Sequence, residues 1–303
     1  MLEVAQHAVS GQPMAEALDN ITGRARRRWH WMRYDDPSPE KLDEMREELL
    51  DHVAARAAQD PALTDETARA ALWTAAECSL GVMSVGCFPN GDQEIVFPLI
   101  DEQLSSENIA FNDVIEQAPT AQTWLTTFTT CLISGLMWDR QRGIGLLLRS
   151  DYAPAIREGV PYSTLTSTSQ PADLAAMDAL CRYLTEASGH LPCDWPTVPL
   201  GKPDPVERAE AAHRLDTAGH LTPDQQLLRV LLDDDQHTFE QALVTRLVEH
   251  RDSAEAADAM PRTLLPVGLV AVAGLAVQVH GWELGVVSGY LPSALLGSPV
   301  ALQ

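Results

Sequence analysis

Three consecutive aspartates, Asp233, Asp234 and Asp235, form the longest run of potential metal ligands in the chain. Carboxylate oxygens are the ligands that Mg²⁺ prefers in proteins, and helical prenyl-chain enzymes bind it on an aspartate-rich helix. Those enzymes also need a second acidic motif facing the first, and the sequence has no matching one. We therefore interpret the run as an acidic turn between two helices and keep a magnesium site as the alternative.

His237 and Glu240 follow this run at a spacing that places both on one face of a helix. A di-iron bundle needs Glu-x-x-His pairs on two helices and carboxylates from two more. Here the order of the pair is reversed, and no second pair exists. Zinc motifs with paired histidines, the Walker loop, the serine elbow and paired CxxC motifs are also missing. We expect no cofactor and no enzymatic activity.

The charge of the chain bears on its partners. Its 43 acidic and 21 basic residues give a formal net charge of −22 over 303 residues. Binding to nucleic acid needs Lys and Arg to neutralise phosphates, so a direct nucleic-acid partner is not expected. The charge favours either a basic partner protein or simple solubility. A cluster of arginines lies between Arg24 and Arg33. This cluster is either a partner-binding patch or the solvated end of a helix, in which case Trp29 and Trp31 pack inward.

Five cysteines are an odd number without metal-like spacing, which is typical of reduced thiols. The first thirty residues lack the basic start and apolar run of a signal peptide. We therefore expect a cytoplasmic protein.

The elements that position these residues are mostly helices. The uncharged run 264–279 predicts a central core helix, since it has no polar face and is short for a bilayer span; we expect no membrane partner. Further helices are expected at 13–31, 38–53, 64–83, 171–188 and 205–217, with Trp73 in the core. Two helix hairpins are expected, at 120–148 and at 222–248, where Thr222 to Gln225 forms a capping box.

Irregular and extended structure is limited to short stretches. Residues 94–100 are the one convincing strand, and Pro98 places it at an edge. Five prolines between residues 189 and 205 exclude a helix there and indicate a linker or a crossover. The fold class that we predict is all-α, built from stacked antiparallel helix hairpins with one short β element near residues 94–100.

Several of these stretches resemble the immunity 49 family of bacterial polymorphic-toxin systems. Phe239-Glu-Gln-Ala-Leu243, continuing to Leu247 and His250, resembles the family's F-x-x-A-L … L-x-x-H helix. The apolar helix and Tyr290-Leu-Pro-Ser-Ala-Leu-Leu296 follow in the same order as in the family. The stretch Trp124-Leu-Thr-Thr-Phe128 is similar to its central helix, and the stretch 67–86 is similar to its amino-terminal helical part.

The resemblance implies an immunity protein that binds and neutralises a cognate toxin, and it brings no catalytic residues with it. We expect a basic toxin, because many toxins of such systems are basic nucleases, and we name Asp233, Asp234, Asp235 and Glu240 as candidate contacts. The expected organisation is an N-terminal helix with the basic cluster (1–37), a helical immunity-like domain (38–296, with a possible crossover at 189–205) and a tail (297–303). The alternatives are a helical-bundle enzyme using Mg²⁺ at the aspartates and a helical adaptor for a non-toxin partner.

Overall fold

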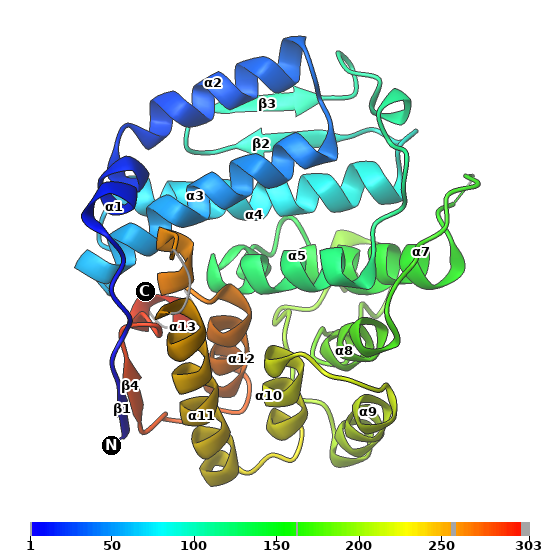
Figure 1. The fold of residues 1–303 in the computed structure, drawn as a ribbon. Helices are drawn as coiled ribbons and strands as arrows, with labels where there is room; N and C mark the ends of the chain where they lie inside the picture. Colours follow the sequence, from blue (N-terminus) through cyan, green and yellow to red (C-terminus); the bar gives the residue numbers. More distant parts are fainter. Residues whose placement is uncertain (1, 162, 256–258, 298–303) are drawn as a thin grey trace.

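The computed structural model describes residues 2–161, 163–255 and 259–297, and it confirms the prediction of a mostly α-helical chain (Figure 1). The helices in this part are α1 (Gly11–Leu18), α2 (Ile21–Tyr34), α3 (Pro39–Gln59), α4 (Glu66–Cys87), α5 (Ala121–Ile133), α6 (Ile144–Leu146), α7 (Ala153–Glu158), α8 (Pro171–Cys181), α9 (Pro205–Thr217), α10 (Pro223–Leu231), α11 (Gln236–Glu255), α12 (Val267–Gln278) and α13 (Ser293–Leu296). The strands are β1 (Leu2–Val4), β2 (Glu94–Phe97), β3 (Glu102–Ser105) and β4 (Val286–Ser288).

Helix α12 is the core helix that the uncharged run predicted. Its residues from Leu269 to Ala276 are all buried. It packs against α5, which is far from it in the sequence, and against α10 and α13, one of which precedes it and one of which follows it. The segments Glu66–Cys87 and Pro261–Gln278 are long and apolar enough to cross a membrane, but neighbouring elements bury most of each of them, as in core helices.

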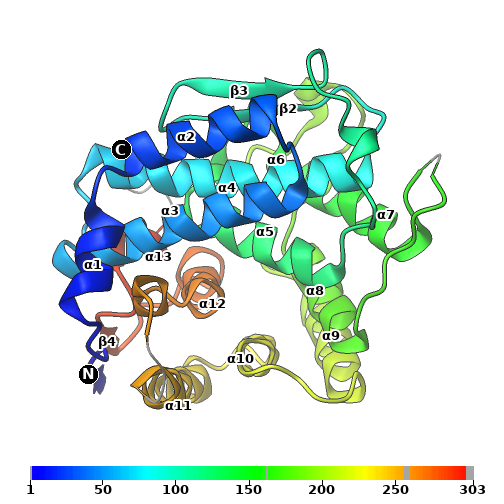
Figure 2. The same ribbon diagram turned by 45° about the horizontal axis from the view of Figure 1, so that its top comes forward.

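The helices form successive packed layers, which Figures 1 and 2 show from two directions. Helices α3 and α4 make the most extensive contact among the described elements, with α2 and the β2–β3 hairpin packed on this pair. Helix α5 lies against α4 and also contacts α8 and α12. Helices α9, α10 and α11 complete the other side of the molecule. Helix α5 therefore joins the N-terminal pair to the C-terminal half.

Both expected hairpins are present, but the return segment of the first one is irregular. Helices α10 and α11 pack together, and the capping box is present: Thr222 Oγ1 accepts from Gln225 N at 3.3 Å, and Gln225 Oε1 accepts from Thr222 N at 2.9 Å. After α5 the return begins with the single turn α6 and continues as a π-helix, Leu147–Tyr152, before α7. Pro154 lacks the N–H that would continue an α-helical ladder. The indole N–H of Trp124 donates to Leu148 O at 2.9 Å, inside the π-helix.

The β structure differs in part from the prediction. The predicted strand is shorter, ending at Phe97, and pairs antiparallel with β3 in a hairpin. A second pair was not predicted: β1 lies parallel to β4, with Leu2 opposite Val286. Its strands have three residues each and lie at opposite ends of the chain, so no local pattern identifies them.

The helix expected at 13–31 is divided in two. Asn20 has a φ of 33° in the left-handed region, and its side chain accepts from Gly23 N at 3.2 Å to begin α2. Two tryptophans expected inside lie largely outside: Trp31 is 57% exposed and Trp73 is 48% exposed. The indole N–H of Trp73 instead donates to Ser134 O at 2.7 Å. Trp29 is partly buried against the core, as expected.

The proline-rich stretch 189–205 folds back on the end of α8, which stops at Cys181 and not near Ser188 as expected. Thr185 N donates to Pro199 O at 2.9 Å, and Gly201 N donates to Tyr183 O at 2.8 Å. Buried residues on both sides of this stretch belong to one hydrophobic cluster. Of the expected tail, residues 298–303 lie outside the described part of the chain.

Candidate functional site

The predicted acidic turn lies between α10 and α11, and each of its three carboxylates has a different partner within the chain. Asp233 pairs with Arg229 Nη1 at 2.6 Å and is half exposed. Asp235 caps α11: its side chain accepts from His237 N at 3.0 Å and from Thr238 Oγ1 at 2.9 Å. These hydrogen bonds from Thr238 and His237 hold the pKa of the exposed Asp235 carboxyl below its usual value.

Asp234 lies at the centre of a network that joins four segments. Its φ of 61° puts it in the left-handed region, which asparagine and aspartate tolerate better than most residues. Its carboxylate accepts from Lys202 Nζ at 2.7 Å, Arg208 Nη2 at 3.1 Å and His280 Nδ1 at 2.8 Å. Partial burial on its own would raise the pKa of Asp234, but these three groups outweigh it and keep the pKa below its ordinary value.

Glu240 connects α11 to the segment before β4. Its Oε1 accepts from Gly285 N and from Gln236 Nε2, both at 2.9 Å. The hydrogen bonds from Gly285 and Gln236 lower the pKa of the Glu240 carboxyl. Asp234 and Glu240 therefore shape the turn region, whereas the side chains of Asp233 and Asp235 lie on its exposed surface.

The aspartate run does not converge on a common point, as a metal site would require. In residues 2–161, 163–255 and 259–297, no three His, Cys, Asp or Glu side chains are grouped so that they could hold a metal ion. His237, considered for a di-iron pair, is exposed and lies 3.0 Å from Gln241 Nε2. The partners Lys202, Arg208 and His280 were not identified from the sequence, because they come from distant segments without a shared motif.

The basic cluster of α2 is largely occupied by the acidic face of α3. Arg24 Nε lies 3.1 Å from Glu48, and Arg28 pairs with both Glu44 and Glu48. Arg26 donates to Ile100 O at 3.2 Å, in the turn of the β2–β3 hairpin. Most of the cluster thus attaches α2 to its neighbours.

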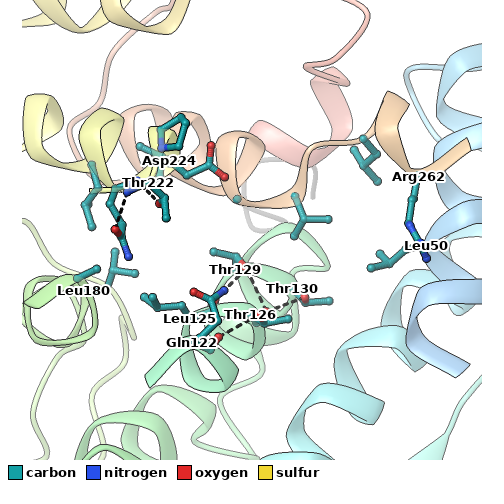
Figure 3. A pocket seen from close by; sticks show the side chains of 18 of the residues that line it. Leu50, Gln122, Leu125, Thr126, Thr129, Thr130, Leu180, Thr222, Asp224 and Arg262 are labelled. Carbon is teal, nitrogen blue, oxygen red and sulfur yellow. Dashed lines mark hydrogen bonds between the residues drawn. The ribbon is translucent and has the colours of Figure 1, made fainter. Parts of the chain in front are cut away.

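A cleft of about 500 Å³ lies where α3, α5, α8, α10 and α12 meet (Figure 3). Its wall on α5 carries Thr126, Thr129 and Thr130, whose hydroxyls donate to carbonyls of the preceding turn of their own helix. Leucines line much of the remainder, among them Leu50, Leu125 and Leu180. Threonine hydroxyls engaged in this way still accept hydrogen bonds, so the cleft offers apolar contact and acceptors to a bound segment.

The charged groups at the edge of this cleft are paired with one another. Asp224 Oδ1 accepts from Arg246 Nε at 2.8 Å, and Arg262 pairs with Glu47. Gly268 leaves room for the Asp224 side chain, since a Cβ there would lie 2.3 Å from Oδ2 of Asp224. A concave surface with apolar walls and a paired charged rim is an arrangement that supports binding.

The segments behind the family resemblance form the framework around these features. Phe239 is fully buried, with its ring centroid 5.5 Å from that of Trp282, and His250 Nε2 donates to Thr263 O at 2.7 Å. The hydroxyl of Tyr290 accepts from His7 N at 2.9 Å and lies 2.6 Å from His7 Nδ1. These residues fix the C-terminal helices and attach the N-terminal strand to them.

The sequence model of the family Immunity protein 49 matches residues 60–295. The chain belongs to this family. No curated protein and no solved structure matches it. The match begins directly after α3, so α1, α2 with the arginine cluster and α3 lie outside it. The acidic turn lies within it, and so does the cleft except for its wall on α3. In this member of the Immunity protein 49 family, the motif residues Trp124, Phe239 and Tyr290 are all fully buried, so they specify the fold and leave the choice of partner to the surface.

Proposed function

We propose that this chain is an immunity protein that binds a cognate toxin and neutralises it by binding alone, protecting the cell that produces both. Membership of the Immunity protein 49 family carries the proposal. The paired charges of the cleft and the separated carboxylates of the turn agree with a role in binding.

We further propose that the toxin is basic. The net charge of −22 would attract a cationic protein over a distance, which raises the association rate more than the final affinity. If the toxin acts on nucleic acid, an acidic inhibitor covers the same cationic surface that the substrate needs. We propose neither nucleic acid nor a membrane as a direct partner of the chain.

Among the candidate contacts, we propose that Asp233 and Asp235 touch the toxin directly and that Asp234 and Glu240 hold the turn in place. The first two are exposed, whereas the second two are committed to hydrogen bonds with distant segments. We also propose that the protein acts in the cytoplasm, since all five of its cysteines are free thiols.

The test is co-expression of the chain with the product of the neighbouring gene, scored by growth and by co-purification. Rescue from a lethal neighbour together with a stable complex supports the proposal. A harmless neighbour, or a complex with a protein that is not toxic, favours the helical adaptor. A thermal shift that requires Mg²⁺ and is abolished by Asp234→Ala would favour the enzyme.

The contact residues are tested by the double variant Asp233→Asn, Asp235→Asn, in which asparagine preserves the capping role of residue 235. We expect weaker toxin binding and a smaller dependence of affinity on salt. The matched control is Glu107→Gln, Glu116→Gln, which removes the same charge at two exposed positions in the loop before α5. Equal toxin affinity and equal salt dependence in both double variants would show that the turn is not part of the interface.

A further inference from the structure

A second hollow, of about 600 Å³, lies between α4, the loop before β2, β2 itself and the segment from Arg142 to Tyr152. Its walls are partly apolar and are formed by Leu80, Phe88, Ile95, Ile144 and Leu147. A volume of this size lies within the roughly 300–1,000 Å³ typical of ligand pockets. It is separate from the cleft of Figure 3 and shares no lining residue with it.

The carboxylates around this hollow outnumber the cations. Glu77, Asp92, Glu94 and Asp151 line it, against Arg142 alone. Glu77 is 3% exposed and pairs with Arg142. Burial raises the pKa of Glu77, and Arg142 opposes this rise. Asp92, Glu94 and Asp151 have no ion pair with any described residue. This contrasts with the acidic face of α3, where arginines already occupy the carboxylates.

Tyr152 provides an independent sign that the hollow is built for a ligand. The residue is only 5% exposed and lines the hollow, yet its hydroxyl makes no hydrogen bond to any residue in the described part of the chain. The hydroxyl oxygen is not one of the buried, unpartnered atoms of the described residues, so it remains open to a group that enters the hollow.

The backbone around Tyr152 is also unusual. The residue ends the π-helix Leu147–Tyr152, and π-helices are rare and frequently lie at functional sites. Leu147, Asp151 and Tyr152 all belong to this π-helix and line the same hollow. An apolar wall, three unpaired carboxylates and an acceptor hydroxyl together match a cationic head group on an aliphatic stem.

We propose that this hollow binds a lysine or arginine side chain of the toxin. The proposal rests on the proposed function, and it names a second contact besides the acidic turn. The aliphatic stem packs along Leu80, Ile95 and Leu147. The cationic head reaches Asp151 and donates a hydrogen bond to the hydroxyl of Tyr152, and Asp92 and Glu94 at the entrance attract it.

The binding of agmatine, which carries a guanidinium and an ammonium group on a four-carbon stem, tests the hollow without the toxin. Calorimetric titration of the whole chain should show saturable binding at one site, and n-butanol should give none. The variant Asp151→Asn, Tyr152→Phe keeps the shape of both side chains and should weaken agmatine binding at least tenfold. The control Glu249→Gln, an exposed charge on α11, should leave it unchanged.

The same variants are then titrated with the toxin. The proposal is supported if toxin affinity falls tenfold or more in the Asp151→Asn, Tyr152→Phe variant and is unchanged in Glu249→Gln. Unchanged toxin affinity overturns it, even if agmatine binds. An absence of saturable agmatine binding to the original chain also overturns it. If the double variant fails to fold, Asp92→Asn, Glu94→Gln replaces it, because both side chains are exposed. A chain that binds agmatine but no toxin contradicts the proposed function, so the two failures are distinguishable.

Discussion

Nδ1 of His280 lies 2.8 Å from Oδ1 of Asp234, so a side chain that follows the core helix α12 is hydrogen-bonded to the left-handed turn between α10 and α11. The other ring nitrogen of His280 lies 2.9 Å from the hydroxyl of Tyr183, just beyond α8. A neutral imidazole satisfies both contacts by donating to Asp234 and accepting from Tyr183. His280 therefore holds the turn that carries the candidate contacts, and it does so from the side that faces the core.

Replacing Asp234 by Asn should destabilise the chain. Asparagine tolerates the left-handed backbone, so the loss of stability in this variant measures the contribution of the carboxylate charge. We expect a loss of about 1.5–3 kcal/mol in the free energy of unfolding, because Lys202, Arg208 and His280 lose an ionised acceptor. Urea denaturation measures it. The control Asp233→Asn, at a half-exposed ion pair, should cost at most about 1 kcal/mol. Equal costs in the two variants would contradict the network as we describe it.

Stability should fall as the pH drops from 7.5 to 5.5. Burial lowers the pKa of His52, His250 and His280 below the ordinary histidine value. The unfolded chain then binds more protons than the folded chain below about pH 6.5, so acidification favours unfolding. Thermal denaturation at the two pH values checks this. His280→Gln should show a smaller fall in Tm than the original chain, and His220→Gln, at an exposed position, should show the same fall.

Tyr290→Phe should destabilise the attachment of the N-terminus. Phenylalanine keeps the ring that stacks near His7 and removes the hydroxyl that contacts it twice. The expected loss is about 1–3 kcal/mol, because buried polar groups of His7 lose a partner. Hydrogen exchange should show faster exchange at the β1–β4 pair. Unchanged protection of β1 would show that the tyrosine hydroxyl has no part in holding the strand.

One thiol per native chain should react rapidly with a thiol reagent at pH 8. Cys193 is exposed, whereas Cys78, Cys87, Cys131 and Cys181 are buried. Burial raises the pKa of Cys87 to about 12 and that of Cys181 to about 11, so their reactive thiolate is scarce. In denaturant all five thiols should react. Rapid reaction of a second thiol in the native chain would show that one of the buried positions opens.

The sequence was sufficient for features that depend on local patterns. The uncharged run around Leu269 predicted the buried helix α12, and the capping box of Thr222 predicted the start of α10, because both signals are local. Trp73 illustrates a limit. Its position on an otherwise apolar helix predicts burial, whereas the folded chain leaves it 48% exposed, with its indole N–H donating to distant Ser134 O.

The site was predicted less completely than the fold. The aspartate run was correctly placed in a turn between helices, but the sequence does not show that Asp234 faces inward while its two neighbours face solvent. That difference depends on a left-handed φ and on Lys202, Arg208 and His280, which only the folded chain brings together. Tyr152 carries no signal in the sequence either, because only the folded chain places it on the wall of the hollow.

Inhibition of the purified toxin by the purified chain tests the central claim most directly. The neighbouring gene product is assayed for its toxic activity while the chain is added in increasing amounts, and complex formation is followed in the same samples. We predict that activity falls in proportion to the complex and is lost when every toxin molecule is bound. Full activity of the toxin at saturating concentrations of the chain would contradict the account.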